Sequence, residues 1–481
     1  MKKTILFILP SLTSSQTKGY RKIKYSRFPP LSLLTLAGMT PQDKYKMIVR
    51  DEHVESSDVD EHVDIVAIQT YISSAYRAYE LADKYRERGA KIIMGGLHAT
   101  SLPHEAAQYA DAVCIGPAET VWNKILDDFE KGRLCKFYQG ECTGSAALVP
   151  KPRRDLMNPK AYLLRNTIVT SRGCPHHCDF CYKSTFWGKN YYETRPISKV
   201  EEELDDVQDG LVFFLDDNLL ANKSYCRQLF HSLKGRGITW QSAASLDVAK
   251  DPQYLKEAYE SGCRSLFIGF ESLSSESMKS VNKNVNAVTD YEEAIRVIHA
   301  SGIMINSSFV FGFDNDDADI FDRTIEFGIK NKLETASLHI LTPLPGTPVF
   351  TQMESSGRLL HKNWSLYDVY HAVFQPKRMS PQELEEGHQR TIKEFYSYGS
   401  IINRALGTDG ALKRMAYNIG LWKVDPLWRA IIKFGLMPHA KEILRGRLLY
   451  KNQAQKEKAD VFDRIISPSR LQNYNNSTAA A

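Results

Sequence analysis

The segment SRGCPHHCDFCYKS, residues 171–184, places three cysteines within eight residues and has no fourth cysteine nearby. These cysteines are spaced C-x3-C-x2-C, at Cys174, Cys178 and Cys181. A structural zinc site takes four ligands, usually as two separated pairs, so His176 or His177 would have to complete it. Three thiolates on a [4Fe–4S] cluster instead leave one iron without a protein ligand. The spacing favours the cluster, whose open iron is a place for a small molecule to bind.

Six short apolar runs start just before this segment and continue to about residue 350. Most are separated by amphipathic stretches typical of helices, and each run ends in polar residues or glycine. The runs are LRNTIVTSRG, LVFFLDDN, TWQSAASLD, SLFIGFES, IMINSSFVFGFD and ASLHILTPLPGTP. Six βα units in series predict a partial (βα)6 TIM-type barrel over residues 164–360, because a complete barrel needs eight. Ligands of such barrels gather at the carboxyl ends of the strands, which is where the cysteine segment begins.

Residues 1–132 show a second alternation of strands and helices. The Ile- and Val-rich runs are KTILFILPSL, YKMIVRD, VDIVAIQTY, AKIIMGGLH and DAVCIG, with helical stretches such as SAYRAYELADKYRERG between them. This alternation predicts a doubly wound, Rossmann-like α/β domain with buried parallel strands. The apolar part of the first run follows two lysines, as in a signal peptide. However, it is short, Pro10 interrupts it and no small-residue cleavage site follows. We therefore expect it to be the first strand.

The remaining segments differ in composition from these two regions. Residues 133–163 contain scattered glycines and prolines and are expected to be a linker, residues 361–470 a helical C-terminal region and residues 471–481 a disordered tail. The net charge of +5 is concentrated in residues 404–451, where ten Lys or Arg face three acids and mix with large apolar side chains. This stretch indicates either a helical cap with a solvated basic face or a peripheral contact at the inner membrane surface. No nucleic-acid-binding motif accompanies the charge, so a nucleic-acid partner is not expected.

The overall composition is that of a globular protein. Of the 481 residues, 43% are hydrophobic and 25% are charged, and no run of about 18 apolar residues predicts a membrane-spanning helix. Eight unevenly spaced cysteines are too few for a disulfide framework and fit a reducing compartment. These features predict a cytoplasmic protein.

The motif C-x3-C-x-F-C after a first barrel strand resembles the signature of the radical S-adenosylmethionine (radical SAM) superfamily. The resemblance implies that the three cysteines hold a [4Fe–4S] cluster and that SAM chelates the open iron through its amino and carboxylate groups. An electron passed to the cluster then cleaves SAM, and the resulting 5′-deoxyadenosyl radical abstracts a hydrogen atom. The resemblance therefore also implies an electron donor such as flavodoxin or ferredoxin.

The same resemblance implies where SAM lies along the barrel strands. Residues 213–218, FFLDDN, resemble the segment that meets the SAM amino group, through Asp216 and Asp217; alternatively, Asp217 and Asn218 cap the next helix. Glu271, at the end of the fourth run, is expected to contact the ribose; alternatively, it pairs with a nearby base such as Lys283. Further candidates at strand ends are Ser245, Ser308 and Lys283. No individual catalytic side chain follows from the sequence.

The N-terminal domain resembles that of the cobalamin-binding radical SAM enzymes, and the match covers most of residues 1–375. It is carried by FPPLSLLTLAG, YISSAYRAYELADKYRERGAKIIMGGLHAT and DAVCIGPAET. Gly95 and Gly96 leave room for a bulky ligand beside the backbone, and the candidates for bonding corrin amides or the nucleotide tail are Ser73, Ser74 and Thr100. The D-x-H-x-x-G motif that supplies a cobalt-ligating histidine is absent. Its absence implies cobalamin bound without that ligand, or a domain that keeps the fold and binds no cofactor.

The resemblance implies an enzyme that modifies an unactivated carbon, most members being C-methyltransferases. Hopanoid methylases are similar in layout, and the basic and apolar C-terminal stretch suits a hydrophobic or lipid-like small-molecule substrate. An oxidative cyclase resembling the anaerobic magnesium-protoporphyrin cyclase is a second interpretation. A cluster-bearing binding or electron-transfer protein without SAM chemistry is a third.

Overall fold

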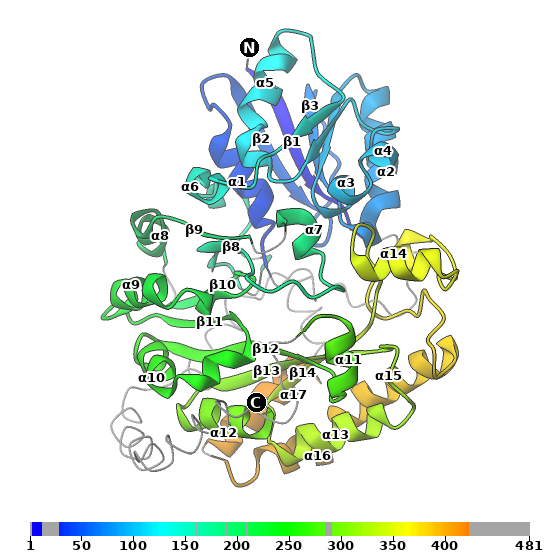
Figure 1. The fold of residues 1–481 in the computed structure, drawn as a ribbon. Coiled ribbons are helices and arrows are strands. Elements are labelled where there is room, and N and C mark those ends of the chain that lie inside the picture. The colour runs from blue at the N-terminus through cyan, green and yellow to red at the C-terminus, as the bar shows by residue number, and fades with distance from the viewer. Residues whose placement is uncertain are drawn as a thin grey trace.

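Two parallel β-sheets, one above the other in Figure 1, form the framework of the protein. The computed structural model describes residues 2–11, 28–159, 161–162, 164–188, 191–207, 210–283, 291–408 and 410–422. The N-terminal sheet has the strand order β2-β1-β3-β4-β5-β6. Its strands are β1 (Lys3–Leu9), β2 (Tyr45–Asp51), β3 (Ile65–Gln69), β4 (Lys91–Gly95), β5 (Ala112–Ile115) and β6 (Phe137–Gln139). The predicted first strand is thus β1, which lies between β2 and β3 in this sheet.

Helices cover both faces of the N-terminal sheet, because its central strands are apolar on both sides. In β1, Leu6 and Ile8 belong to the core on one face, whereas Ile5 and Phe7 belong to the core on the other. The covering helices are α1 (Leu31–Met39) and α5 (Trp122–Glu130) on one face and α2 (Ala75–Glu87), α3 (Leu97–Ser101) and α4 (Pro103–Ala106) on the other. The chain leaves β1 for β2 on one side and returns to β3 on the other, which makes the β1–β3 boundary the switch point of a doubly wound sheet.

The second sheet is the predicted partial barrel, with the strand order β14-β13-β12-β11-β10-β7. Its strands are β7 (Thr167–Ile168), β10 (Leu211–Phe214), β11 (Thr239–Ala244), β12 (Cys263–Glu271), β13 (Met304–Phe311) and β14 (Thr335–Ile340). All five pairings are parallel. The outer helices are α8 (Ile197–Leu204), α9 (Lys223–Leu233), α10 (Pro252–Glu260), α11 (Ser275–Ser280), α12 (Tyr291–Ala300) and α13 (Ile320–Lys330). The predicted fold class, a doubly wound domain followed by a partial barrel and a helical region, is confirmed.

The first barrel run does not form one strand as the sequence suggests. It divides into β7 and β8 (Ser171–Gly173), and β8 pairs in antiparallel fashion with β9 (Tyr192–Thr194). The division occurs where the Asp216 side chain accepts the backbone N–H groups of Thr170 and Ser171, which removes these donors from the sheet. The β8–β9 hairpin encloses the cysteine loop and the short helix α7 (Lys183–Trp187), which lies between the two sheets in Figure 1.

The segment between α14 (Pro348–Ser355) and α15 (Pro381–Phe395) contacts both sheets. Trp364, in the 3-10 turn η8 (Trp364–Leu366), belongs to the hydrophobic core of the N-terminal sheet, and its indole N–H donates to Glu105 over 3.0 Å. The other C-terminal helices are α14 (Pro348–Ser355), α15 (Pro381–Phe395), α16 (Tyr398–Ala405) and α17 (Ala411–Trp422). The start of the predicted helical region, residues 361–380, is therefore largely irregular chain that docks on the N-terminal sheet. The domain boundaries at 132, 163 and 360 remain predictions.

Only the first part of the basic stretch 404–451 lies within the described residues. Arg404 is 2% exposed and donates to the carbonyl oxygens of Leu333 and Glu334, each over 2.6 Å. Arg414 forms an ion pair with the buried Glu334 carboxylate. These two arginines therefore face the protein interior rather than a membrane. Residues 423–451 and the predicted tail 471–481 lie outside the described residues. No helix in the described ranges is long and apolar enough to cross a bilayer.

Candidate functional site

The cysteine loop begins directly after β8 and ends at α7. Gly173 adopts a positive φ of 80°, and a Cβ there would lie 2.1 Å from the carbonyl oxygen of Tyr191, so only glycine fits this position. Within the loop, the backbone N–H of Cys181 donates to the carbonyl of Cys178 over 3.0 Å. The loop is also held from outside, because the N–H of Asp179 donates to the carbonyl of Val281 over 3.0 Å. The sequence thus fixes a tight turn that presents three thiols from one short segment.

The donor set of this loop fits an iron–sulfur cluster. Cys174, Cys178 and Cys181 are each partly exposed, as ligands of an added group must be. Burial raises the pKa of Cys178 to about 12 and also raises that of Cys181, so positive charge is needed to hold these groups as thiolates. Within the described part of the chain, no three His, Cys, Asp or Glu side chains are arranged to hold a single metal ion. In a [4Fe–4S] cluster each thiolate binds a different iron, so such convergence is not required.

Asp216 has a structural set of partners. It is 4% exposed, and its Oδ1 accepts hydrogen bonds from the N–H and hydroxyl of Thr170 at 3.1 and 2.9 Å and from those of Ser171. Burial raises its pKa to about 6, although these hydrogen bonds oppose the shift. The carboxyl group expected to meet the SAM ammonium is therefore occupied in holding the chain that leads into the cysteine loop.

Asp217 and Asn218, by contrast, lie at the loop itself. Asp217 forms an ion pair over 2.5 Å with Lys183, which follows the last cysteine of the motif by two residues. Burial opposes the charged form of Lys183, but the neighbouring Asp217 carboxylate raises the pKa of Lys183 above the usual value for a lysine. Asn218 is 3% exposed, and its Nδ2 donates to the Ser245 hydroxyl over 3.1 Å and approaches the Cys174 Sγ at 3.9 Å. The ends of β10 and β11 thus meet at the first cysteine. The sequence indicated Asn218 as part of the segment 213–218 and, alternatively, as a helix cap, but not as a neighbour of this cysteine.

Glu271 and Lys283 form a nearly buried ion pair at the end of β12. The Lys283 Nζ lies 2.5 Å from the Glu271 Oε1 and donates to the Gly269 carbonyl over 2.9 Å, with both charged side chains about one-tenth exposed. Glu271 adopts a φ of 66°, which is rare for a residue with a side chain and recurs at functional sites. The structure therefore pairs two of the predicted SAM contacts with each other. Ser308 is buried within β13, where it lies opposite Gly269 of β12.

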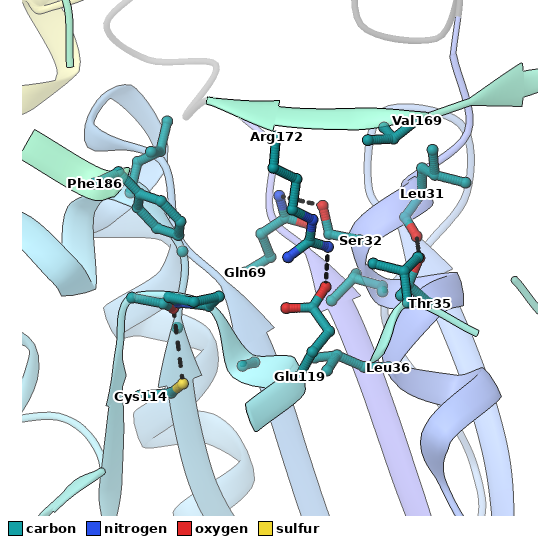
Figure 2. Close-up of a pocket in the computed structure, with 18 of the residues that line it drawn as sticks. Leu31, Ser32, Thr35, Leu36, Gln69, Cys114, Glu119, Val169, Arg172 and Phe186 are labelled. Carbon is teal, nitrogen blue, oxygen red and sulfur yellow. Dashed lines mark hydrogen bonds and ion pairs between the residues drawn. The ribbon is translucent and has the colours of Figure 1, made fainter. Parts of the chain in front are cut away.

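A cavity of about 350 Å³ lies between the carboxyl edge of the N-terminal sheet and the cysteine loop. Figure 2 shows α1 and the N-terminal strands on one side and β8, which carries Arg172, above them. Gln69, Gly95 and Gly96 line the cavity from the N-terminal sheet. Tyr182 lines it from the cysteine loop and Asp217 from the end of β10. One cavity therefore connects the predicted cobalamin edge with the predicted SAM edge.

The predicted cobalamin contacts divide into lining residues and supporting residues. Gly96 lines the cavity with a φ of 98°, and a Cβ there would lie 3.0 Å from the Thr70 carbonyl oxygen. Thr100 does not line the cavity; its hydroxyl accepts the N–H of Gly116, a lining residue, over 3.0 Å. The hydroxyl of Ser74 is turned back to the Tyr71 carbonyl at 3.3 Å, and Ser73 precedes it in the same 3-10 turn, η2 (Ile72–Ser74), outside the lining.

An ion pair between Arg172 and Glu119 crosses this cavity and was not expected from the sequence. Arg172 lies on β8, two residues before Cys174, whereas Glu119 follows β5 of the N-terminal sheet. Figure 2 shows the two side chains pointing toward one another from opposite walls. The guanidinium also lies 5.3 Å from the ring centre of Trp187. Burial opposes the charge of Arg172, but Glu119 raises its pKa. The pair links the cofactor edge of the N-terminal sheet to the strand that positions the cysteine loop.

Comparisons with known proteins agree with this geometry. Residues 168–328 match the radical SAM superfamily, and residues 24–126 match the B12 binding domain. Bacteriochlorophyllide d C-12(1)-methyltransferase from Chlorobaculum tepidum is 32% identical over 72% of this chain and 77% of its own length. The chain belongs to the cobalamin-binding radical SAM enzymes. Its cofactors are accordingly a [4Fe–4S] cluster, SAM and cobalamin, and the interpretation as a binding protein without SAM chemistry is set aside.

Other members of the cobalamin-binding radical SAM enzymes extend the match. Bacteriochlorophyllide d C-8(2)-methyltransferase from the same organism is 27% identical over 82% of this chain and 91% of its own length. The anaerobic magnesium-protoporphyrin IX monomethyl ester cyclase from Rubrivivax gelatinosus is 21% identical over 82% of this chain. The solved structure of the cobalamin-dependent radical SAM enzyme OxsB shares the fold, with a TM-score of 0.67 at 15% identity over 99% of this chain and 80% of that one.

Proposed function

We propose that this enzyme transfers a methyl group to an unactivated carbon of a hydrophobic, tetrapyrrole-like small molecule. The observation that carries the proposal is the single cavity that joins the two predicted cofactor edges, from Gly95 and Gly96 on one side to Tyr182 and Asp217 on the other. A methyl donor and a radical generator must act on the same substrate carbon, so their sites have to share one enclosed space. The two bacteriochlorophyllide methyltransferases support the tetrapyrrole class.

The cysteine loop is the proposed radical-generating end of this space. Cys174, Cys178 and Cys181 hold the [4Fe–4S] cluster, which supplies the electron that cleaves SAM. Asp217, at the cavity edge beside Lys183, is placed for the SAM ammonium, and Ser245 and Asn218 lie at the first cysteine. Glu271 and Lys283, at the end of β12, pair with each other and do not line this cavity. The contact of Glu271 with the SAM ribose stays part of the proposal.

The carboxyl edge of the N-terminal sheet is the proposed cobalamin site. Gly95 and Gly96 leave the backbone bare, and the buried Oε1 of Gln69, which lacks a hydrogen-bond partner, is available to the N–H groups of a corrin amide. When bound there, cobalamin supplies the methyl group that the substrate carbon receives. Thr100 and Ser74 support the walls of this site from behind, through the contacts described above.

The test is product analysis with anaerobically reconstituted enzyme, SAM, cobalamin, a reductant and chlorophyllide as substrate. We expect equal amounts of 5′-deoxyadenosine and S-adenosylhomocysteine and a product heavier by one methyl group. Cys178→Ala should abolish all three, whereas Cys135→Ala, which removes an exposed thiol outside the loop, should not. Formation of 5′-deoxyadenosine without S-adenosylhomocysteine would favour the cyclase interpretation, and absence of both with every tetrapyrrole tried would contradict the proposal.

Two further parts of the proposal concern partners. An electron donor of the flavodoxin or ferredoxin class is required to reduce the cluster, and reduction by such a protein in place of a chemical reductant tests it. The proposed peripheral contact with the inner membrane surface is assigned to residues 423–451, because Arg404 and Arg414 make internal contacts. Sedimentation with anionic vesicles, compared between the full chain and a chain ending at residue 422, tests that contact.

A further inference from the structure

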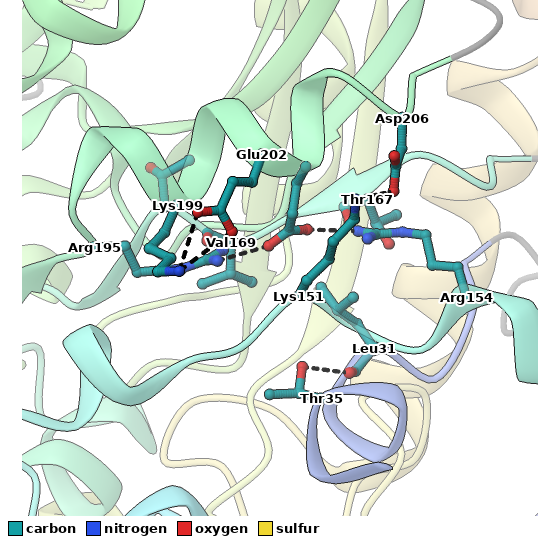
Figure 3. Close-up of polar contacts among 12 residues, drawn as sticks. Leu31, Thr35, Lys151, Arg154, Thr167, Val169, Arg195, Lys199, Glu202 and Asp206 are labelled. Carbon is teal, nitrogen blue, oxygen red and sulfur yellow. Dashed lines mark hydrogen bonds and ion pairs between the residues drawn. The ribbon is translucent and has the colours of Figure 1, made fainter. Parts of the chain in front are cut away.

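Two arginines and one glutamate form a buried charge cluster beside the cavity. The Glu203 carboxylate of α8 lies between Arg195, with Oε1 2.7 Å from Nη2, and Arg154, with Oε2 2.9 Å from Nη2. Figure 3 shows Arg154 and Arg195 pointing toward one another above α1. The Glu203 and Arg195 side chains are each 1% exposed, and that of Arg154 is 19% exposed. The Arg–Glu–Arg cluster is thus almost fully removed from water.

The two arginines and one glutamate give the Arg–Glu–Arg cluster a net charge of one positive unit. Two nearby acids are not available to balance it, because Asp206 pairs with Lys151 over 2.7 Å and Glu202 pairs with Lys199 over 3.0 Å. Backbone carbonyl groups accept some of the guanidinium donors, including that of Val169 from Arg195 over 2.7 Å, but they add no negative charge. A buried charge without a counter-charge is costly, so the cluster favours an added anion.

One member of the cluster also has an unused donor at the cavity. Arg195 is 2% exposed, its Nε has no hydrogen-bond partner, and both Arg195 and Glu203 line the cavity between the two sheets. A buried donor without an acceptor is destabilising, and a ligand oxygen that accepted its hydrogen bond would remove that cost. The excess charge and the unused donor therefore call for the same kind of group, an oxyanion.

We infer that the Arg–Glu–Arg cluster is an oxyanion-binding site at one end of the cofactor cavity. The inference rests on the proposed function, which brings two oxyanions to this space: the phosphodiester of the cobalamin nucleotide tail and a carboxylate of a chlorophyllide-type substrate. Arg195 binds the oxyanion directly. Arg154 also pairs with Glu203, so the single carboxylate does not neutralise both guanidinium groups and one positive charge is left for the ligand.

Binding titrations distinguish the two sources of the oxyanion, the nucleotide tail and the substrate. They use the full-length enzyme with its [4Fe–4S] cluster in place. Cobinamide lacks the nucleotide and its phosphate, so the first comparison is hydroxocobalamin against cobinamide, followed by absorbance. The second comparison is chlorophyllide against its methyl ester. A hydrogen bond to a charged group contributes about 1.5–3 kcal/mol, so the oxyanion-bearing ligand should bind roughly ten- to a hundredfold more tightly. Arg195→Gln should abolish that preference while leaving the affinity for cobinamide or the ester unchanged.

A second variant separates binding from structural support. Glu203→Gln breaks the same ion pairs but raises the net positive charge, so it should keep or increase the preference that Arg195→Gln abolishes. Arg77→Gln, which removes an ion pair with Glu52 outside the cavity, is the matched control and should leave both comparisons unchanged. If both comparisons give equal affinities in the wild type, or if Arg195→Gln and Glu203→Gln reduce the preference alike, the inference is overturned. Failure of the wild type to bind any cobalamin would instead contradict the cobalamin site itself.

Discussion

Gly173→Ala is the substitution that probes most directly how the fold positions the cluster. The position combines a φ of 80° with a close approach, since an added Cβ would lie 2.1 Å from the Tyr191 carbonyl oxygen and 2.7 Å from its ring. Ordinary contact begins near 3.4 Å, so the backbone at Tyr191, directly before β9, would have to move by more than an ångström. The three residue pairs of the β8–β9 hairpin, and with them the first cysteine, would have to shift.

Gly235 provides a matched control. It has the same φ of 80°, and a Cβ there would meet nothing within 4 Å. Gly235→Ala therefore costs only the left-handed backbone conformation, about 1–2 kcal/mol. Gly173→Ala adds steric overlap in a packed region, a further cost of about 1–3 kcal/mol. A difference of about 2 kcal/mol between the two variants corresponds to about 4–8 °C in Tm for a domain of 150–250 residues.

The assay is calorimetry together with iron and sulfide analysis after anaerobic reconstitution. Gly235→Ala should retain a full cluster with a modest fall in Tm, whereas Gly173→Ala should melt at a lower temperature and retain less iron. If the two variants melt together and hold equal iron, the close approach of Gly173 to Tyr191 does not constrain the cysteine loop, and the argument from the hairpin is wrong.

Three further predictions follow from contacts around the site. Asn218→Ala removes the amide beside the first cluster cysteine and should lower the cluster's reduction potential with unchanged iron content; a redox titration that shows no shift would contradict the contact. Glu271→Ala leaves Lys283 buried without its partner and should reduce the unfolding free energy by about 3 kcal/mol, most of which the double change with Lys283→Met should recover; equal denaturant midpoints for the single and double variants would refute the pairing. Glu105→Ala leaves the indole N–H of η8 without an acceptor and should cost about 1–3 kcal/mol and speed proteolysis of residues 355–375, which a digestion time course measures.

The fold was predictable because buried parallel strands are recognisable one at a time. Runs such as residues 4–9 are apolar on both faces, and their alternation with amphipathic helices specifies a doubly wound sheet without any distant contact. The division of the first barrel run was not predictable in this way, because the carboxylate that interrupts it, Asp216, lies more than forty residues along the chain. The docking of residues 361–380 on the N-terminal sheet was also not predictable, because it depends on the hydrogen bond between Trp364 and Glu105, which are far apart in the sequence.

The contacts of the site residues were less predictable from the sequence than the fold. A polar residue or glycine at a strand end predicts a position near the ligand edge, and Asp217 and Gly96 both line the cavity. The pattern does not predict what a side chain there binds. Glu271 and Lys283 were each expected at SAM and are found paired, because two opposite charges at one edge satisfy each other before any ligand arrives. The sequence indicated the pairing of Glu271 with Lys283 only as an alternative, and it gave no indication of the ion pair that crosses the cavity from β8, because each pair depends on how separate segments fold together. These long-range pairs set the charge of the cavity, so they, rather than the strand-end residues alone, determine which ligand groups the cavity accepts.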